Sequence, residues 1–345
     1  MPSPDQLSER ELKVLEAVVQ TYIETAEPAG SQTIARRFGL GVSPATIRHT
    51  MSELEDKGYL FHPHTSAGRI PTDRAYRVYV NEIMRLAPPT REARHALQTE
   101  LLGSRNAVEE ILRRAAQVLG VLTQELGVAV APALDEMILE RIELVRVSSE
   151  RLLLVFNLRT GVVRTIFVEV PARVSAESVF EVARLLNERL SGLSLTRIRT
   201  TLPERLRDIG TQPNGAELLN IFIAEREDIF ALSDEQRAVV LGSAQMLADQ
   251  PEFASNVRMR DLLRLTEGRD LLREALAARR QMGISVTIGG ENPDTRLSDF
   301  TLVTASYQAG GLKGVIGVMG PTRMPYDKII GLVEHTSRLV EGLLE

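Results

Sequence analysis

Apolar residues near the N-terminus recur at helical spacing and predict a long first helix. They occupy positions i, i+3, i+4, i+7 and i+8, so they share one buried stripe. This stripe consists of Leu15, Val18, Val19, Tyr22 and Ile23. Ser8 and Glu11 have the spacing of a capping box, so the helix is predicted to begin there. Pro28 and Gly30 end it.

Two shorter helices are predicted next. Ser31 is expected to cap a helix over residues 32–38, and Ser43, followed by Pro44, a helix over residues 44–57. A short helix, a glycine turn and a capped helix follow one another in a helix-turn-helix. On the last helix, small or hydrogen-bonding side chains lie opposite the apolar face, as a major-groove helix requires. They are Ala45, Thr46, Arg48, His49 and Ser52. An amphipathic helix with a solvated outer face fits the same pattern.

A short β-hairpin is predicted directly after the third helix. Residues 59–61 and 70–71 are the two strands, and residues 62–69 form a loop with basic and hydroxyl side chains. Thr72 then caps a helix over residues 73–86. A hairpin in this position predicts a wing, which contacts the DNA backbone or minor groove. His62 and His64 lack a nearby third ligand, so we expect no metal there.

The remainder of the chain alternates between helical and strand patterns. After a break at Pro88 and Pro89, residues 108–125 keep a helical stripe, and three strand-like segments follow as a meander. Helical periodicity is then expected over residues 175–190, past 217, around 235–241 and over 262–280. Strands are expected over residues 284–289, 300–307 and 311–321, and a closing helix over 325–345. This order predicts an α+β domain interrupted by a helical insert.

The distribution of charge singles out one segment of an acidic chain. The protein has 41 Lys and Arg against 46 Asp and Glu, a net charge of −5. Residues 1–27 carry a net charge of −4, whereas residues 28–80 carry +3. Only the second segment would therefore be attracted to phosphates. A solvated surface with a chance imbalance explains the charges equally well.

Length and composition exclude several classes of protein. A chain of 345 residues predicts two or three domains. The absence of cysteine excludes disulfides, a thiol nucleophile and thiolate metal sites. There is neither the apolar core of a signal peptide nor a run of about 18 apolar residues, so we expect a cytoplasmic protein without membrane association.

Candidate catalytic or cofactor motifs are weak. Residues 289–292 (GGEN) lack the Lys-Ser/Thr ending of a phosphate loop, and the glycines at 311–320 fit close strand packing better than a cofactor loop. Neither His95 nor His335 lies near a Gly-x-Ser-x-Gly elbow. We therefore expect neither an enzyme nor a cofactor.

Two unusual runs resemble a known family. They are residues 43–48 (SPATIR) and residues 63–73 (PHTSAGRIPTD), and the second is followed by Tyr76-Arg77 and Tyr79-Val80. Together they resemble the heat-inducible transcription repressor family HrcA, and the resemblance covers essentially the whole chain. The sequence departs from the family pattern at His49-Thr50, where Asn and an acidic or other polar residue are expected.

The resemblance implies a domain organisation and a function. It implies a winged helix-turn-helix over residues 1–88, a GAF-like domain over 89–171 and 236–345, and an inserted dimerisation domain over 172–235. A homodimer would repress chaperone operons by binding a CIRCE-type inverted repeat in double-stranded DNA. The chaperonin would act as co-effector and support the active state.

The chemistry of the side chains then predicts the contacts. Thr46, Arg48 and His49 are expected at base edges. The residues expected at phosphates or in the wing are Ser31, Arg36, Ser43, His64, Thr65, Ser66 and Arg69. Two alternatives stay open: a regulator whose GAF-like pocket senses a metabolite, and a winged helix that docks proteins or forms part of an enzyme.

Overall fold

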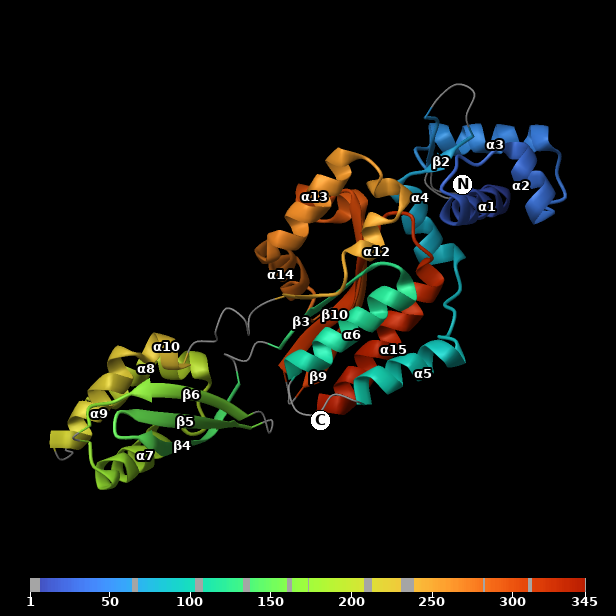
Figure 1. The fold of residues 1–345 in the computed structure, drawn as a ribbon. Helices are drawn as coiled ribbons and strands as arrows, with labels where there is room; N and C mark the ends of the chain where they lie inside the picture. Colours follow the sequence, from blue (N-terminus) through green and yellow to red (C-terminus); the bar gives the residue numbers. More distant parts are fainter. Residues whose placement is uncertain are drawn as a thin grey trace. The chain divides into compact units, whose positions relative to one another are not determined.

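In the computed structural model, helices and strands are mixed along the chain (Figure 1). The structure describes residues 7–63, 68–102, 108–132, 137–159, 163–172, 174–207, 213–230, 239–281, 283–309 and 312–344. The predicted contact residues His64, Thr65 and Ser66 lie outside these ranges. The chain divides into two compact units. The first comprises Met1–Ala129, Val240–Ser306 and Ile316–Val340, and the second Val130–Val239, Tyr307–Val315 and Glu341–Glu345.

The first elements of the first unit form what we call the N-terminal head. They are α1 (Glu9–Thr25), α2 (Ser31–Phe38), α3 (Pro44–Asp56), β1 (Leu60–Phe61) and β2 (Ile70–Pro71). The predicted capping box at Ser8 and Glu11 is confirmed, and Leu15, Val18 and Val19 are buried. Ser43 caps α3 as predicted, because its hydroxyl oxygen accepts a hydrogen bond from the Thr46 N–H.

The predicted cap of α2 is wrong by one residue. Gly30 is the N-cap, since its carbonyl accepts the first helical hydrogen bond, from the Ile34 N–H at 3.0 Å. Ser31 is instead the first residue of the helix and is buried. The N-terminus of α2 therefore has no capping side chain.

Strands β1 and β2 pair antiparallel, with Leu60 opposite Pro71 and Phe61 opposite Ile70. The predicted helix after Thr72 is shorter than expected. It consists of α4 (Asp73–Val78) and a π-helical turn, η1 (Tyr79–Ile83), and it ends because Met84 adopts an extended conformation.

The rest of the first unit is organised around a five-stranded sheet with the order β7-β3-β10-β9-β8. Its strands are β3 (Leu126–Val130), β7 (Val239–Leu241), β8 (Ile284–Ile288), β9 (Phe300–Ala309) and β10 (Leu312–Pro321). Figure 1 shows α6 and α15 on one side of this sheet and α13 and α14 on the other. The helices are α5 (Arg91–Leu102), α6 (Val108–Thr123), α12 (Gln245–Ala248), α13 (Asn256–Glu267), α14 (Arg269–Ala277) and α15 (Tyr326–Leu344). Short 3-10 turns are η3 (Pro251–Phe253), η4 (Gly289–Glu291) and η5 (Thr295–Leu297).

Two of the helix predictions in this region are wrong. Residues 239–241 were expected in a helix but form β7, which pairs with a strand more than 100 residues earlier. The helix expected over residues 262–280 is divided into α13 and α14, because Gly268 ends α13.

The second unit packs a meander against helices. Strands β4 (Leu139–Ser148), β5 (Arg151–Leu158) and β6 (Val163–Glu169) pair antiparallel in sequence order, as predicted. The helices are α7 (Ala176–Leu190), α8 (Leu195–Arg205), α9 (Pro213–Ala224) and α10 (Arg226–Phe230). Alternate residues of β5, such as Leu154 and Phe156, lie in the same core as Leu186 and Phe222 of the helices.

The compact unit that holds the meander begins at Val130. The boundaries expected for the GAF-like domain (89–171 and 236–345) and for the dimerisation insert (172–235) stay a prediction. Among the described residues, no helix is both long and apolar enough to cross a bilayer.

Candidate nucleic-acid interface

A hollow of about 500 Å³ on the head brings together several of the predicted contact residues. Its lining comes from the loop before α2, from α2 and α3, and from both sides of the β1–β2 loop. The lining residues are Ala29, Gly30, Ser31, Gln32, Thr33, Arg36, Arg48, Met51, His62, Gly68 and Arg69. Ser31, Arg36, Arg48 and Arg69, four of the ten predicted contacts, therefore meet at one place.

The hollow is electropositive. Arg36 and Arg48 are exposed. Within the described part of the chain, the Arg48 guanidinium has no ion pair or hydrogen bond, and the Arg36 Nε donates only to the Gln32 carbonyl at 3.4 Å. The uncapped N-terminus of α2 adds the partial positive charge of its free N–H groups. Two guanidinium groups beside such a helix end suit an anion such as a phosphate.

Arg69 is held differently from the other two arginines. Its backbone exchanges two hydrogen bonds of 2.9 Å with Ala29. Its Nε lies 2.7 Å from Glu55 Oε2, an ion pair without the alignment of a hydrogen bond. Only 16% of the side chain is exposed, so part of its charge is neutralised within the head.

Gly68 brings this segment against the loop between α1 and α2. A Cβ atom at position 68 would lie 2.3 Å from the Ala29 carbonyl oxygen and 2.6 Å from that of Pro28. Only glycine therefore allows the two segments to approach so closely.

Helix α3 presents its predicted polar face to solvent. Ile47, Met51 and Leu54 are buried as predicted, while Arg48 and His49 are exposed. His49 Nε2 lies 3.4 Å from Glu53 Oε1 on the next turn of the helix.

The remaining predicted residues of α3 lie beside the hollow rather than in it. The Ser43 hydroxyl is already used as the cap of α3, and it lies 3.0 Å from the half-exposed hydroxyl of Thr46. Thr46, His49 and Ser43 do not line the hollow.

Sequence reasoning missed four features of this region. Gln32 and Thr33 line the hollow because they follow Gly30 at the start of α2, and His62 lines it from the residue directly after β1. Gln32 and Thr33 follow a glycine at the start of a helix, and this position in the sequence could have indicated that they lie at the exposed helix end. Thr50 is fully buried, and its hydroxyl has no hydrogen-bond partner among the described residues. Position 50 completes the i, i+3, i+4, i+7 spacing of Ile47, Met51 and Leu54, so the helical period, though not the residue type, indicates this burial.

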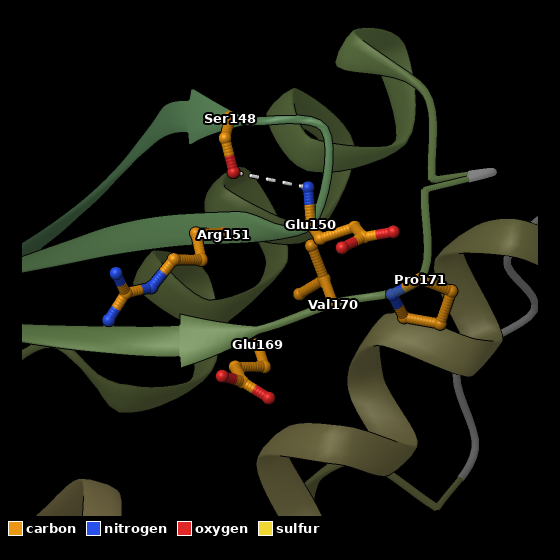
Figure 2. Close-up of a pocket in the computed structure, with 6 residues that line it drawn as sticks. All are labelled: Ser148, Glu150, Arg151, Glu169, Val170 and Pro171. Atoms are coloured by element: carbon orange, nitrogen blue, oxygen red, sulfur yellow. Dashed lines mark hydrogen bonds between the residues drawn. The ribbon is translucent and has the colours of Figure 1, made fainter.

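A hollow in the second unit has a different character. It lies at the β4–β5 turn and the end of β6 (Figure 2). Glu150 is fixed through its backbone, which donates to the Ser148 hydroxyl at 3.3 Å and accepts from the Val170 N–H at 2.9 Å. In Figure 2 the Arg151 guanidinium and the Glu150 carboxylate point in opposite directions. Arg151 lies directly opposite Glu169 on the neighbouring strand, so the lining carries charges of both signs and has no excess of positive charge.

Comparisons with known proteins agree with the resemblance. A family model described as "HrcA protein C terminal domain" matches residues 109–330. A heat-inducible transcription repressor HrcA from Chlorobium phaeobacteroides (strain BS1) is 38% identical over 95% of this chain and 96% of its own length. The HrcA of Geobacter sulfurreducens is 33% identical over 98% of each chain.

One solved structure has the same overall fold. It is described as a hypothetical protein, with 24% identity and a TM-score of 0.66 over 98% of this chain and 99% of its own. The near-complete coverage of named repressors defines the class of protein, a transcription repressor. Within that class, the chain belongs to the HrcA family of heat-inducible transcription repressors.

Proposed function

We propose that this protein represses heat-shock (chaperone) operons by binding an inverted-repeat DNA operator of the CIRCE type as a homodimer. The observation that carries the proposal is the electropositive hollow of the head, where Arg36 and Arg48 meet the uncapped end of α2. Duplex DNA offers a phosphate at regular intervals along each strand, and positive groups next to an exposed helix suit this pattern.

In this proposal the head is a winged helix-turn-helix and α3 is its recognition helix. Arg48, Thr46 and His49 approach base edges in the major groove. The planar fork of Arg48 suits guanine, whose O6 and N7 accept two hydrogen bonds. The absence of a protein partner within the described chain leaves this guanidinium available.

Phosphates are bound around the base contacts. Arg36 and the first N–H groups of α2, at Ser31, hold one phosphate in the hollow. Ser43 contacts the backbone near the start of α3, and Arg69 supports the wing that carries His64, Thr65 and Ser66. The ion pair of Arg69 with Glu55 makes its contribution to phosphate binding smaller than that of Arg36.

The second unit supplies the dimer contact. The face of the β4–β5–β6 sheet opposite its core exposes a cluster of apolar side chains. These are Val145, Val147, Val163 and Phe167, each about half exposed. An apolar patch of this kind marks an interaction surface. A two-fold dimer requires the same patch on both chains and reads a two-fold operator.

Control by temperature is part of the proposal. The sheet region of the first unit is GAF-like, and the chaperonin supports a DNA-competent state of the repressor. When heat engages the chaperonin elsewhere, this state loses population and repression falls. The names of the relatives, heat-inducible repressors, support this assignment.

Arg48→Ala tests the proposed base contact. We expect binding to the inverted repeat to weaken by about 1–3 kcal/mol, with relaxed preference at one base pair. The exposed Arg91 of α5 provides a control, since Arg91→Ala removes the same charge outside the head. Fluorescence anisotropy with operator and random duplexes measures both. Equal operator binding by the wild type and Arg48→Ala would overturn the assignment of α3.

A further inference from the structure

Two arginines outside the hollow connect the head to the sheet region of the same compact unit. Arg323 follows β10, and Arg77 lies in α4. Arg323 bonds to Glu252 and to the backbone of α1, a set that we call the α1 latch. Arg77 bonds to Glu291 beside a contact of Asp73, a set that we call the α4 latch. Neither arginine lines the hollow.

The α1 latch acts on the end of a helix. Arg323 Nη1 donates to the Ile23 carbonyl at 2.7 Å. This carbonyl lies in the last turn of α1, where intrahelical partners are lacking and a positive charge is favourable. Two other nitrogens of Arg323 donate to the two carboxylate oxygens of Glu252, with Nη2–Oε2 at 3.0 Å. Only 15% of the Arg323 side chain is exposed, so the latch is largely shielded from water.

The α4 latch uses one turn of α4. Arg77 donates to both carboxylate oxygens of Glu291, with Nε–Oε1 at 2.8 Å, and also to the Val286 carbonyl at 2.7 Å. Asp73 Oδ2 accepts a hydrogen bond from the Gly290 N–H at 2.9 Å. Burial raises the pKa of Glu291, but hydrogen bonds from Arg77 and the Ile288 N–H outweigh it and hold the pKa below its usual range.

Helix α4 also bonds to the head through neighbouring residues. The Thr72 hydroxyl lies 2.8 Å from the Gly58 carbonyl oxygen and 3.0 Å from that of Tyr59. Arg74 donates to the Lys57 carbonyl at 3.1 Å and lies over the Tyr59 ring, 4.5 Å from its centroid. Residues 72 and 74 thus hold the head, while residues 73 and 77 hold the sheet region. Because α4 is hydrogen-bonded to both, it fixes the position of the head relative to the sheet region.

We propose that Arg77 and Arg323 are positioning residues for operator binding, which fix the direction in which the head presents α3. This inference rests on the proposed function. The two half-sites of an inverted repeat lie at a set distance, so both heads of a dimer must be held at a matching distance. Once one head is bound, the second binds with an effective concentration that depends on this geometry. Binding to a single half-site needs only one head, so it does not depend on the distance between the two heads.

Two duplexes distinguish positioning from direct contact. The full-length protein is titrated with an inverted-repeat duplex and with a duplex that contains one half-site. For Arg77→Ala and Arg323→Ala we expect affinity for the half-site within about twofold of the wild type, and affinity for the full site lower by about tenfold or more. Arg184→Ala, which removes an exposed ion pair with Glu188 in the second unit, is the charge-matched control.

A variant that keeps both arginines makes the test independent of their charge. Gly289 has a φ of +53°, and a Cβ atom there would lie 2.1 Å from Asp73 Oδ2, so Gly289→Ala disturbs the Asp73 contact of the α4 latch without removing an arginine; circular dichroism checks that the variant is folded. It must lower the ratio of full-site to half-site affinity in the same way. An unchanged ratio in Gly289→Ala and in the folded arginine variants would overturn the inference, and so would an equal loss on both duplexes. If the wild type binds neither duplex, the proposed function fails instead.

Discussion

Glu125 is a buried carboxyl group directly before β3, with only 2% of its surface exposed. Its Oε2 accepts a hydrogen bond from Gln250 Nε2 at 3.0 Å. Burial is the main cause that raises the pKa of Glu125 well above its ordinary value; the nearby Glu252 adds to the rise, and Arg323 opposes it. The folded protein therefore keeps a proton on Glu125 that the unfolded chain releases.

Retention of this proton in the folded state makes the free energy of unfolding depend on pH. Because the folded-state pKa lies above the unfolded one, the free energy of unfolding falls as pH rises from the unfolded pKa through the folded pKa. Glu125→Gln keeps the group neutral, so we expect the variant to gain stability over the wild type as the pH rises above the ordinary pKa of a glutamic acid. Urea unfolding at several pH values measures the difference. Glu267→Gln, at an exposed carboxyl group, is the control and should show no such trend. A constant difference for Glu125→Gln would contradict the assignment.

At the scale of elements, the sequence predicted those helices whose formation depends on residues close to each other in the chain. The apolar stripe and capping box predicted α1, and Ser43 with Pro44 predicted α3. Strand β7 was missed because three residues show no period and their pairing with β3 is distant in the sequence.

The same distinction applies to the candidate site. Arg36 and Arg48 converge because a short turn joins α2 to α3, which sequence spacing encodes. Two ion pairs, Arg69–Glu55 and Arg323–Glu252, join residues of different elements that only the folded chain brings together. No spacing in the sequence predicts such pairs.

Gly68 allows an element-scale prediction. Gly68→Ala places a methyl group against the Ala29 backbone, so the segment that carries Arg69 must move away from the loop between α1 and α2. We expect binding to operator and random duplexes to weaken alike, by about 1–2 kcal/mol, since the shape of the hollow changes. Gly30→Ala adds the same methyl group to the same hollow, but its nearest neighbour is 3.9 Å away. Anisotropy titrations compare the two; a larger loss in Gly30→Ala than in Gly68→Ala would contradict the packing argument.

At the scale of the whole molecule, the proposed dimer depends on the exposed sheet face of the second unit. Phe167 is 54% exposed and lies opposite Leu153, which on its other side lies opposite Val145. We expect Phe167→Ser to raise the dissociation constant of the dimer by about tenfold or more, because apolar anchors dominate such contacts. Val257→Ser, at a side chain 65% exposed on α13, is the control. Sedimentation equilibrium measures both, and an unchanged dimer in Phe167→Ser would exclude this face.

Nuclease protection of the DNA upstream of the chaperonin operon tests the central claim most directly. The wild-type protein, with chaperonin present, should protect both arms of an inverted repeat symmetrically. Arg48→Ala should lose this protection at the same concentration, while Arg91→Ala keeps it. Folded wild-type protein that leaves every palindromic promoter segment open to the nuclease would contradict the account.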